Sequence, residues 1–443
     1  MKSFFKKFVV IILTLEARAV ITRRKPFIVA VTGSVGKTST KDAIFEVLRS
    51  IEEDKTNIRK SEKSFNSEIG VPLTILGLSN AWYNPIHWFW NILRGAFLIV
   101  SPFAYPKTLV LEIGADHPGD IAKTTIWMTP NVTVVTRIPD RPVHVEFFSG
   151  PDEVRKEKAE LVRALPENGV FVANADDPAV ASLSILTKAE MFSYGFKDGA
   201  DLQGSTPEIM YIAGEYGRVP IGMMFSVVWE HETYKVLSKG VLGAQSSLSA
   251  LAALAVGIVR SVPIKDAILA LERLESPRGR MRIVEGKGAT TILDDSYNSS
   301  PVAAESALET LRAVEGNHKV ALLGDMLELG EYSKEEHWRI GRIAGSFVDT
   351  LVVVGERARM IAEAAKTAGL PQEKIHTFAD AVSAGEWVSQ QLKPGDVILA
   401  KGSQGSGANM IRIERAVRIL MAHPEQAGEM LVRQERQWQE QYR

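Results

Sequence analysis

The chain has 443 residues, of which 45% are apolar and 24% are charged, as in an ordinary folded protein. Its length predicts about two or three domains, and its formal net charge of −1 excludes a general basic field for nucleic acid, so we expect no nucleic-acid partner. The absence of cysteine excludes disulfides, thiolate metal sites and a cysteine nucleophile.

Residues 1–25 form a basic and apolar N-terminal segment. Its charge-free apolar run covers residues 8–15, well short of the ~18 residues that a membrane-spanning helix needs. The basic start and the small residues Ala17 and Ala19 resemble a signal peptide, but the next segment predicts a nucleotide-binding protein, which export would separate from ATP. An amphipathic helix would place on one face Phe4, Phe8, Ile11, Leu15 and Ala19. Such a helix either lies in a membrane surface or covers the protein's own core, and the pattern leaves both open.

The next segment predicts a phosphate-binding loop. "PFIVAV" (26–31) is typical of a buried parallel strand, and apolar residues at helical spacing follow Lys37. Four residues separate the glycines of the common phosphate loop, whereas two separate Gly33 and Gly36. A strand–turn–helix unit can still cradle phosphates with its backbone N–H groups, with Lys37 at the terminal phosphates and the Thr38 hydroxyl on Mg²⁺. The predicted nucleotide contacts in this loop are Gly33, Ser34, Val35, Gly36, Lys37, Thr38 and Ser39.

Residues 69–106 are almost free of charge. Arg94 is the only formally charged residue, and Trp82, Trp88 and Trp90 lie close together. Bulky aromatic residues beside proline and glycine can form a patch for a partner or a membrane. A helix and loop buried under the central sheet would have the same composition, and on composition alone we favour burial.

Polar side chains follow the later strands. "TLVLEI" (108–113) predicts a strand that brings Glu112 to its carboxyl end, and ligands of open α/β sheets bind at that edge. A carboxylate there can hold Mg²⁺ that bridges phosphates. His144 follows the next strand, residues 131–135, and can reach the same edge, although a lone histidine is usually structural.

Residues 154–162 predict a helix with a lysine on its inward face. Val154, Lys158, Leu161 and Val162 lie roughly along that face. An inward lysine is normally a side chain whose ammonium group reaches the surface. An ammonium group cannot bind Mg²⁺, whereas a lysine carbamylated by CO₂ carries a carboxylate that can. Spacing alone does not distinguish these two states.

The order of the elements predicts an α/β protein. Residues 170–173 predict a further strand, and residues 247–259 predict a long apolar helix. Beyond "SPRGR" (276–280), strands and helices alternate regularly, which indicates a parallel, doubly wound sheet. Beyond the N-terminal segment, we therefore expect a central P-loop ATPase domain with a parallel-rich sheet at 26–277 and a Rossmann-like C-terminal domain at 278–443.

Several motifs, in the same order, resemble those of the Mur ligase family. The short G-x-x-G-K-T loop is the form that this family uses. The other matching segments are "NSEIGVPLTIL" (66–76), "LEIGADHPGDIA" (111–122), similar to the family's E-[LI]-G-A-N-H-P-G-E-I-A, "ENGVFVANADD" (167–177), "PRGRM" (277–281), "DDSYNSSP" (294–301) and "ALLGDMLELGEYSKEEH" (321–337). The last of these is most similar to the branch that adds D-alanyl-D-alanine to UDP-N-acetylmuramoyl-tripeptide.

This resemblance implies roles for individual residues. The implied magnesium ligands are Thr38, Glu112, His144 and a carbamylated Lys158, and the implied catalytic residues are Lys37, Glu112, His144 and Lys158. The implied nucleotide contacts of the C-terminal domain, which closes over ATP, are Arg280, Asp295 and Asn298. The implied cofactors are ATP and Mg²⁺, the latter at two sites.

The sequence differs from the family pattern in four places. We expect that the N-terminal domain that holds the UDP-sugar is missing and that the short helix stands in its place. Residues 79–106 form an insertion. Residues 243–246 read G-A-Q-S where the family has G-x-H-N beside the adenine, and residues 401–404 read K-G-S-Q where it has K-G-S-R. The first difference concerns recognition of the UDP-sugar and the third concerns adenine selectivity.

The implied reaction is ATP-dependent amide formation through an acyl phosphate, in peptidoglycan precursor synthesis. The implied partners are a muramoyl-peptide-like acceptor and an amino acid or dipeptide such as D-alanyl-D-alanine. Two other classes stay open: a P-loop NTPase whose hydrolysis drives a conformational switch, and a membrane-associated scaffold without ligation activity. We expect a monomer in the cytoplasm, with peripheral contact to the inner membrane face through residues 1–24 and 79–106.

Overall fold

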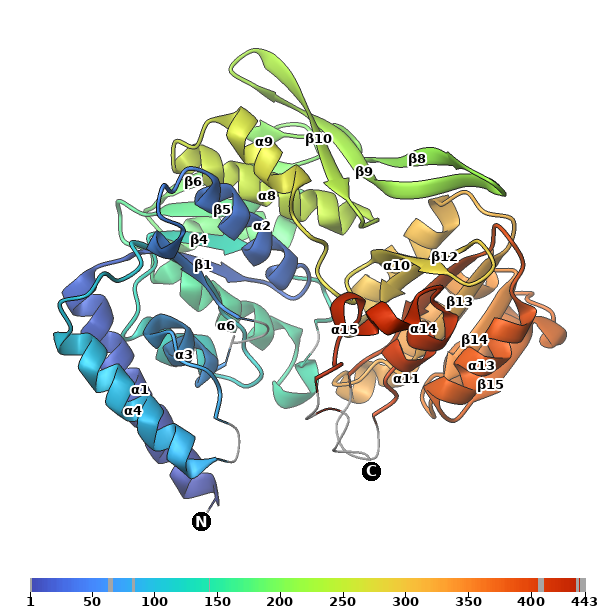
Figure 1. Ribbon diagram of the computed structural model, residues 1–443, viewed down its shortest axis with the longest axis horizontal. Coiled ribbons are helices and arrows are strands. Elements are labelled where there is room, and N and C mark those ends of the chain that lie inside the picture. The colour runs from blue at the N-terminus through green and yellow to red at the C-terminus, as the bar shows by residue number, and fades with distance from the viewer. Residues whose placement is uncertain are drawn as a thin grey trace.

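The computed structural model describes residues 2–62, 67–81, 84–142, 144–404, 410–435 and 438, with side chains from Phe5 onward. Trp82, Asn66 and the side chain of Phe4, all considered above, lie outside the described residues. Figure 1 shows a central sheet with helices on both faces, an antiparallel sheet above it, and a second layered unit formed by the C-terminal part of the chain.

The central sheet has seven parallel strands in the order β2-β3-β1-β4-β5-β6-β7. Its strands are β1 (Phe27–Thr32), β2 (Ile58–Lys60), β3 (Thr108–Glu112), β4 (Val132–Val135), β5 (Val170–Asn174), β6 (Glu190–Gly195) and β7 (Leu202–Gln203). Strand β1 lies between β3 and β4, so the segments that end in the predicted loop and in Glu112 are neighbours.

Helices cover both faces of this sheet because successive side chains of a strand point in opposite directions. Val29 and Val31 of β1 pack with α2 (Lys37–Ser50), α8 (Ala244–Val259) and α9 (Ile264–Glu272). Ile28 and Ala30 pack on the other face, where the helices are α1 (Lys2–Arg24), α3 (Gly70–Leu76), α4 (Pro85–Val100), α5 (Asp120–Thr125) and α6 (Pro151–Arg163). The apolar run of β1 is therefore buried on both sides, as its composition predicts.

A three-stranded antiparallel sheet, which was not among the predicted elements, follows the central strands. Its order is β10-β9-β8, with β8 (Glu208–Gly214), β9 (Gly217–Trp229) and β10 (Glu232–Lys239). Many of its side chains are exposed, and its strands contain several glycine and charged residues, so the alternation that identifies a half-buried strand is weak.

The C-terminal unit is a six-stranded sheet in the order β11-β12-β16-β13-β14-β15, parallel except for β11. Its strands are β11 (Arg282–Gly286), β12 (Thr290–Asp295), β13 (Lys319–Gly324), β14 (Thr350–Val354), β15 (Ile375–Phe378) and β16 (Val397–Lys401). One face is covered by α10 (Pro301–Ala313), α11 (Ser333–Gly345) and α12 (Arg359–Thr367), and the other by α13 (Ala381–Gln391), α14 (Glu414–Leu420) and α15 (Ala427–Met430). The predicted α/β class, with a parallel-rich central sheet and a doubly wound C-terminal sheet, is confirmed.

Short elements connect these units: α7 (Pro178–Ala181), η1 (Lys55–Asn57), η2 (Val145–Phe147), η3 (Ser182–Leu186), η4 (Gly330–Tyr332), η5 (Gln372–Lys374) and η7 (Pro424–Gln426). Residue 277, the predicted domain boundary, lies between the end of α9 and the start of β11, and we keep it as a proposed boundary. Within the described part of the chain, no helix combines the length and apolar character needed to cross a membrane.

Helix α1 has apolar side chains on two opposite faces. Val9, Leu13, Ala17 and Val20 are buried in the core beneath the central sheet. The face predicted from the sequence is a different one, since Phe8, Ile11 and Leu15 are 52%, 59% and 59% exposed. The helix thus covers the core, but with a face that the prediction did not select.

The burial that we favoured for residues 69–106 is wrong for most of α4. Asn84 caps the helix by accepting from the N–H groups of Ile86 and His87. Trp88 is buried, but Trp90 is 54% exposed, with other large apolar side chains beside it. The helix packs one narrow face on α1 and leaves the opposite face uncovered within the described residues.

Candidate active site

The phosphate loop, residues 33–36, joins the end of β1 to the start of α2. Its two glycines have positive φ angles, 139° at Gly33 and 84° at Gly36. A Cβ atom on Gly33 would lie 2.0 Å from Thr136 Oγ1, and one on Gly36 would lie 2.4 Å from Gln245 Nε2. Gly33 therefore requires glycine for space and backbone conformation, whereas Gly36 requires it for backbone conformation, because the Gln245 side chain can move aside.

The residue after β4 holds this loop in place. Thr136 donates its hydroxyl to the carbonyl of Val35 at 2.6 Å. Lys37 Nζ donates to Gly33 O at 2.8 Å, so the lysine folds over the loop. The hydroxyl of Ser34 is buried and has no hydrogen-bond partner within the described residues. The loop thus presents a cation and a spare hydroxyl at the N-terminal end of α2, an arrangement suited to phosphate.

Glu112 lies beside this loop because β3 pairs with β1 in a register that sets Glu112 opposite Val31. Its side chain is 2% exposed and accepts a hydrogen bond from Thr38 Oγ1 at 3.0 Å. Its backbone N–H donates to the hydroxyl of Ser61 at 3.1 Å. Two of the predicted magnesium ligands, Thr38 and Glu112, are therefore in contact.

Two lysines share the site with a carboxylate, Asp116. Burial lowers the pKa of Lys158 to about 7, and Lys37 acts in the same direction while Asp116 opposes it. Burial also lowers the pKa of Lys37, against the opposing effects of Glu112 and Asp116. Lys158 is 3% exposed, and no residue of the described ranges forms a hydrogen bond or ion pair with its ammonium group.

His144 lies where the central and C-terminal units meet. It has a positive φ of 67°, which is uncommon for a residue other than glycine. Its Nδ1 lies 2.8 Å from Glu328 Oε2, and the nearby imidazole lowers the pKa of Glu328. Its Nε2 lies 3.6 Å from Asp116 Oδ1. Asp116 therefore connects His144 to the two lysines.

Of the predicted metal ligands, only Thr38 and Glu112 are in direct contact, so the four do not form one shell. His144 and Lys158 are linked through Asp116. Among the residues described, no three His, Asp or Glu side chains lie close enough to hold a metal ion. Of the four predicted magnesium ligands, only Glu112 and His144 are of these residue types. A third such ligand is present only if Lys158 carries a carboxylate.

A pocket lies between the phosphate loop and the C-terminal sheet. The predicted nucleotide contacts that line it are Ser34, Val35, Gly36, Thr38, Ser39, Arg280, Asp295 and Asn298. Gln245 and Ser246, which replace the family's His and Asn, line it too. The predicted residues that lie outside the lining are Gly33, Lys37, Glu112, His144 and Lys158. The pocket thus brings together the predicted nucleotide contacts other than Gly33 and Lys37, and the lysine–carboxylate cluster lies beside it.

The C-terminal contribution to this pocket is held by a buried ion pair. Lys401 Nζ lies 2.5 Å from Asp295 Oδ2 and donates to Asn298 O at 3.0 Å. The other oxygen of Asp295 accepts from the backbone N–H of Met281 at 3.1 Å. The guanidinium of Arg280 lies 4.0 Å from the ring centroid of Tyr297. These contacts join the start of the C-terminal unit to the loop that follows β12.

Two family profiles match the chain. The profile described as Mur ligase middle domain matches residues 31–257, and the profile of the Mur ligase glutamate ligase domain matches residues 279–404. The first alone spans more than half of the chain. The chain belongs to the Mur ligase family.

Several curated relatives of this Mur ligase share one name. A protein of Mycobacterium tuberculosis, named UDP-N-acetylmuramoyl-tripeptide–D-alanyl-D-alanine ligase, is 29% identical over 405 residues, which cover 87% of this chain and 72% of the relative. A protein of Bacillus subtilis with the same name is 25% identical over 399 residues, which cover 90% of this chain and 76% of the relative. The predicted likeness to this branch, and the predicted ligase class, are confirmed; neither alternative class is favoured.

Solved structures agree on the fold. The crystal structure of the MurF ligase from Thermotoga maritima in complex with ADP matches with a TM-score of 0.72 and 24% identity, over 93% of this chain and 83% of that one. At this identity the likeness concerns the fold, and the ADP belongs to that protein.

Sequence analysis of this Mur ligase missed several residues that shape the site. Glu328 binds His144 from the other domain, which no local pattern reveals. Thr136 orients the phosphate loop from a strand that is distant in sequence. Asp116 could have been noticed from the sequence, because it is an acidic residue where the matching family stretch has a neutral asparagine.

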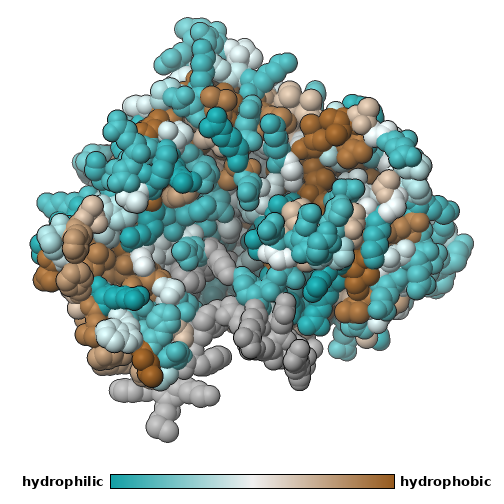
Figure 2. All heavy atoms as spheres, viewed as in Figure 1, coloured by the Kyte–Doolittle hydropathy of each residue, from teal (hydrophilic) through white to brown (hydrophobic). Residues whose placement is uncertain are grey.

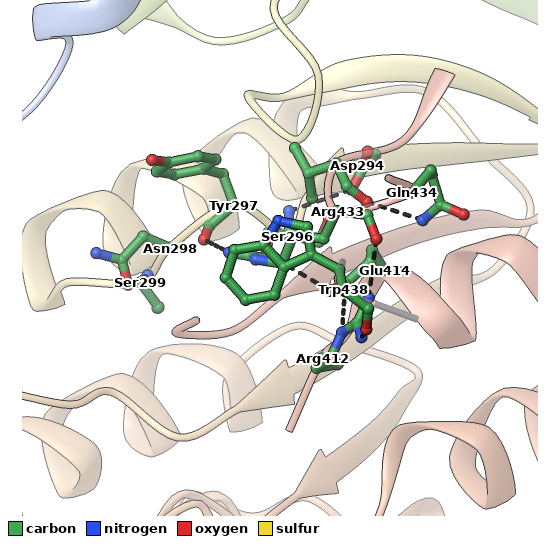
Figure 3. A network of polar contacts seen from close by, with 11 residues as sticks. Asp294, Ser296, Tyr297, Asn298, Ser299, Arg412, Glu414, Arg433, Gln434 and Trp438 are labelled. Atoms are coloured by element: carbon green, nitrogen blue, oxygen red, sulfur yellow. Dashed lines mark hydrogen bonds and ion pairs between the residues drawn. The ribbon is translucent and has the colours of Figure 1, made fainter. Parts of the chain in front are cut away.

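A polar network joins the loop after β12 to the C-terminal tail (Figure 3). Arg433 donates to the carbonyls of Ser296, at 3.2 Å, and of Tyr297, and lies 3.1 Å from Glu414 Oε2. Arg412 Nε lies 2.6 Å from the other carboxylate oxygen of Glu414, which is fully buried. Sequence analysis missed this network because its members lie in three separate segments.

Proposed function

We propose that this Mur ligase joins D-alanyl-D-alanine to the terminal carboxylate of UDP-N-acetylmuramoyl-tripeptide, using ATP. The observation that carries the proposal is the pocket itself. Residues 34–36 and Thr38 line one side of it, and Arg280 and Asp295 line the other. Lys37 folds over the loop beside this lining, and Glu112 accepts a hydrogen bond from Thr38 at the end of the neighbouring strand. The names of the curated relatives supply the substrates.

The reaction requires that two anions approach each other. The acceptor carboxylate attacks the γ-phosphorus of ATP, so ADP leaves and an acyl phosphate forms. The amine of the dipeptide then attacks the acyl carbon, and inorganic phosphate leaves with the former carboxylate oxygen. Lys37 offsets the repulsion in the first step because its cation lies on the phosphate loop.

The donor groups also fit magnesium. The hydroxyl of Thr38 and the carboxylate of Glu112 are oxygen ligands, which Mg²⁺ prefers, and they lie 3.0 Å apart. We propose that Thr38 and Glu112, together with His144 and Lys158, would hold Mg²⁺ ions at two sites. Bound Mg²⁺ would neutralise charge on the phosphates.

We further propose that Lys158 is carbamylated. A buried lysine without an ion-pair partner in the described residues is costly as a cation, and carbamylation converts it into an anion beside Lys37. The amine nitrogen forms a bond to the carbon of CO₂ and loses a proton to solvent. The pKa of about 7 favours this reaction because a substantial fraction of the amine is unprotonated at neutral pH.

The two domains would close the site together. Arg141 of the central unit lies 2.6 Å from Glu336 and 2.9 Å from Glu335 of α11, and His144 contacts Glu328 near this bridge. Closure of this kind would keep water from a hydrolysable acyl phosphate. The C-terminal unit would also carry the incoming amine to the acyl carbon.

For location and assembly, we propose a monomer at the cytoplasmic face of the inner membrane, in peripheral contact through residues 1–24 and 79–106. Light scattering on the purified chain would test the monomer directly. A stable dimer would contradict it.

A phosphate-release assay tests the ligase proposal. We expect release that requires ATP, UDP-N-acetylmuramoyl-tripeptide and D-alanyl-D-alanine together, and that Lys37→Ala abolishes. Lys55→Ala, an exposed lysine beyond α2, is the matched control and should keep the activity. Release that does not depend on the dipeptide would instead indicate a switch NTPase, and no turnover with any amine would indicate a scaffold.

A further inference from the structure

Helices α1 and α4 lie side by side at one end of the molecule (Figure 1). Their C-terminal ends meet, since the guanidinium of Arg24 donates to the carbonyl of Ser101. Earlier in both helices the backbones approach closely, because a Cβ atom on Gly95 would lie 2.1 Å from Glu16 Oε2. The two helices therefore run in the same direction and form one ridge, which we call the α1–α4 ridge.

The outer side of this ridge is apolar. On α1, Phe5, Phe8, Ile11 and Leu15 are 44–59% exposed. On α4, the exposed side chains are Ile86, Phe89, Trp90, Leu93, Phe97 and Val100, at 43–68%. Figure 2 shows brown surface over this part of the molecule. These spacings follow the helical period, so each helix presents a continuous apolar stripe opposite its buried face.

Apart from the buried Glu16, the charged residues of the two helices are basic, and one of them, Lys6, lies 2.9 Å from Glu68 of the segment before α3. Lys7 and Arg18 flank the stripe of α1, and Arg94 flanks that of α4; all three are exposed. Within residues 5–25 and 84–106 the only acidic residue is Glu16, which is 7% exposed and faces Gly95. The exposed surface of the ridge is therefore apolar along its centre and basic at its edges.

We infer that the α1–α4 ridge lies on an anionic lipid bilayer, with its apolar stripes in the interface and its basic edges at the headgroups. An exposed tryptophan such as Trp90 suits the headgroup region, because its ring is amphipathic. Each helix alone would give weak, reversible binding, and two stripes side by side give a larger apolar area. The inference deepens the proposed membrane contact, and the ligase proposal does not depend on it.

The charge pattern favours a bilayer over a second copy of the chain. In a symmetric dimer through the ridge, Arg18 and Arg94 of one copy would face the same basic edges of the other. Anionic headgroups instead meet these cations favourably. The described helices do not span a membrane, so the contact is peripheral.

Vesicle flotation with the full chain tests the inference. We expect binding to vesicles of phosphatidylcholine with 30% phosphatidylglycerol, and at least tenfold weaker binding to phosphatidylcholine alone. Trp90→Ser with Phe97→Ser should weaken binding to the anionic vesicles at least tenfold, because both side chains are exposed on the ridge. Arg18→Glu with Arg94→Glu should do the same through charge.

The matched control is Ile126→Ser with Ile185→Ser, which removes two apolar side chains of 78% and 85% exposure away from the ridge. It should bind like the unmodified chain, and all variants should keep their phosphate release in solution. Absence of binding to the anionic vesicles, or binding that the ridge variants do not change, overturns the inference. Concentration-dependent dimers that the ridge variants dissolve would overturn it too, in favour of a second copy.

Discussion

Lys158 is the residue whose chemistry matters most to the proposed mechanism. If it carries a carbamate, Lys158→Ala removes a magnesium ligand and should lower ligation by at least about a hundredfold. Formate or acetate in the buffer should restore part of the activity, because a free carboxylate can occupy the vacated position. Lys156→Ala, at an exposed position of the same helix, is the control. Full activity of Lys158→Ala would show that the carbamate assignment is wrong.

Gln245 and Ser246 concern nucleotide selectivity. Gln245 lies against Gly36 of the phosphate loop, and Ser246 donates its hydroxyl to Gly243 O at 2.7 Å. We expect ATP to be used, with weaker discrimination against GTP than the family pattern implies. The double variant Gln245→His/Ser246→Asn should then raise the ATP-to-GTP ratio of kcat/KM by about tenfold, or 1.4 kcal/mol. A sharp ATP preference in the unmodified chain, lost only on changing Asp295 or Arg280, would make this pair irrelevant.

Prediction at the residue scale succeeded where a residue belongs to a local motif. Gly33 to Thr38 are consecutive residues between a strand and a helix, and Glu112 ends a strand, so both could be expected at one sheet edge. Glu328 could not, because its contact with His144 joins residues that are far apart in the sequence. The same holds for the burial of Lys158, which no spacing rule separates from an ordinary surface lysine.

Among the elements, α1 shows what a helical period in the sequence can predict and what it cannot. The period correctly groups Phe8, Ile11 and Leu15, but it does not say which of two apolar faces meets the core. Glu16 lies on the buried side, where an acidic residue is not expected from the sequence, so its charge favours the wrong face. The antiparallel sheet β8–β10 escaped prediction because its partly exposed strands lack a clean alternation.

The buried carboxyl of Glu16 should make stability depend on pH. Burial raises its pKa from 4.5 to about 7, so the folded chain holds this proton more tightly than the unfolded chain. The contribution of protonated Glu16 to the free energy of unfolding is therefore complete below pH 4.5 and is lost as the pH rises through about 7. Glu16→Gln removes this titration, so the stability of the variant relative to the unmodified chain should rise by roughly 1–3 kcal/mol between pH 5 and pH 8.

Thermal unfolding of both proteins between pH 5 and pH 8 measures this effect. The difference in Tm, variant minus unmodified chain, should grow with pH. A constant difference would mean that Glu16 does not titrate in this range.

The C-terminal tail contacts the loop after β12 through Arg433. Arg433→Ala removes the donor to the carbonyls of Ser296 and Tyr297 and leaves Glu414 with fewer partners (Figure 3). Breaking a buried pair of this kind costs about 3–5 kcal/mol, so Tm should fall. Because the same loop carries Asp295 and Asn298, the Kd for ATP should rise severalfold, and Arg433→Lys should recover little of either loss.

Calorimetric titration with ATP and thermal unfolding separate two roles for the tail. A lower Tm with an unchanged Kd for ATP would mean that the tail only stabilises the C-terminal unit. In that case the tail would not position the pocket loop.

At the scale of the whole molecule, alternating strands and helices predicted the layered architecture, because each strand–helix unit is local in sequence. The contacts between the units were beyond such reasoning. His144 with Glu328, and Arg141 with Glu335 and Glu336, join residues from separate domains, and they set how the proposed site closes. The family resemblance supplied the reaction class, which periodicity alone does not reach.

The central claim is ligation through an acyl phosphate, and oxygen transfer tests it most directly. UDP-N-acetylmuramoyl-tripeptide labelled with ¹⁸O in its terminal carboxylate is incubated with ATP, D-alanyl-D-alanine and the enzyme. Mass spectrometry of both products then follows the label. The mechanism predicts that each new amide bond appears with a phosphate that carries one ¹⁸O from the acceptor. Unlabelled phosphate, or phosphate released without the amide product, would contradict it.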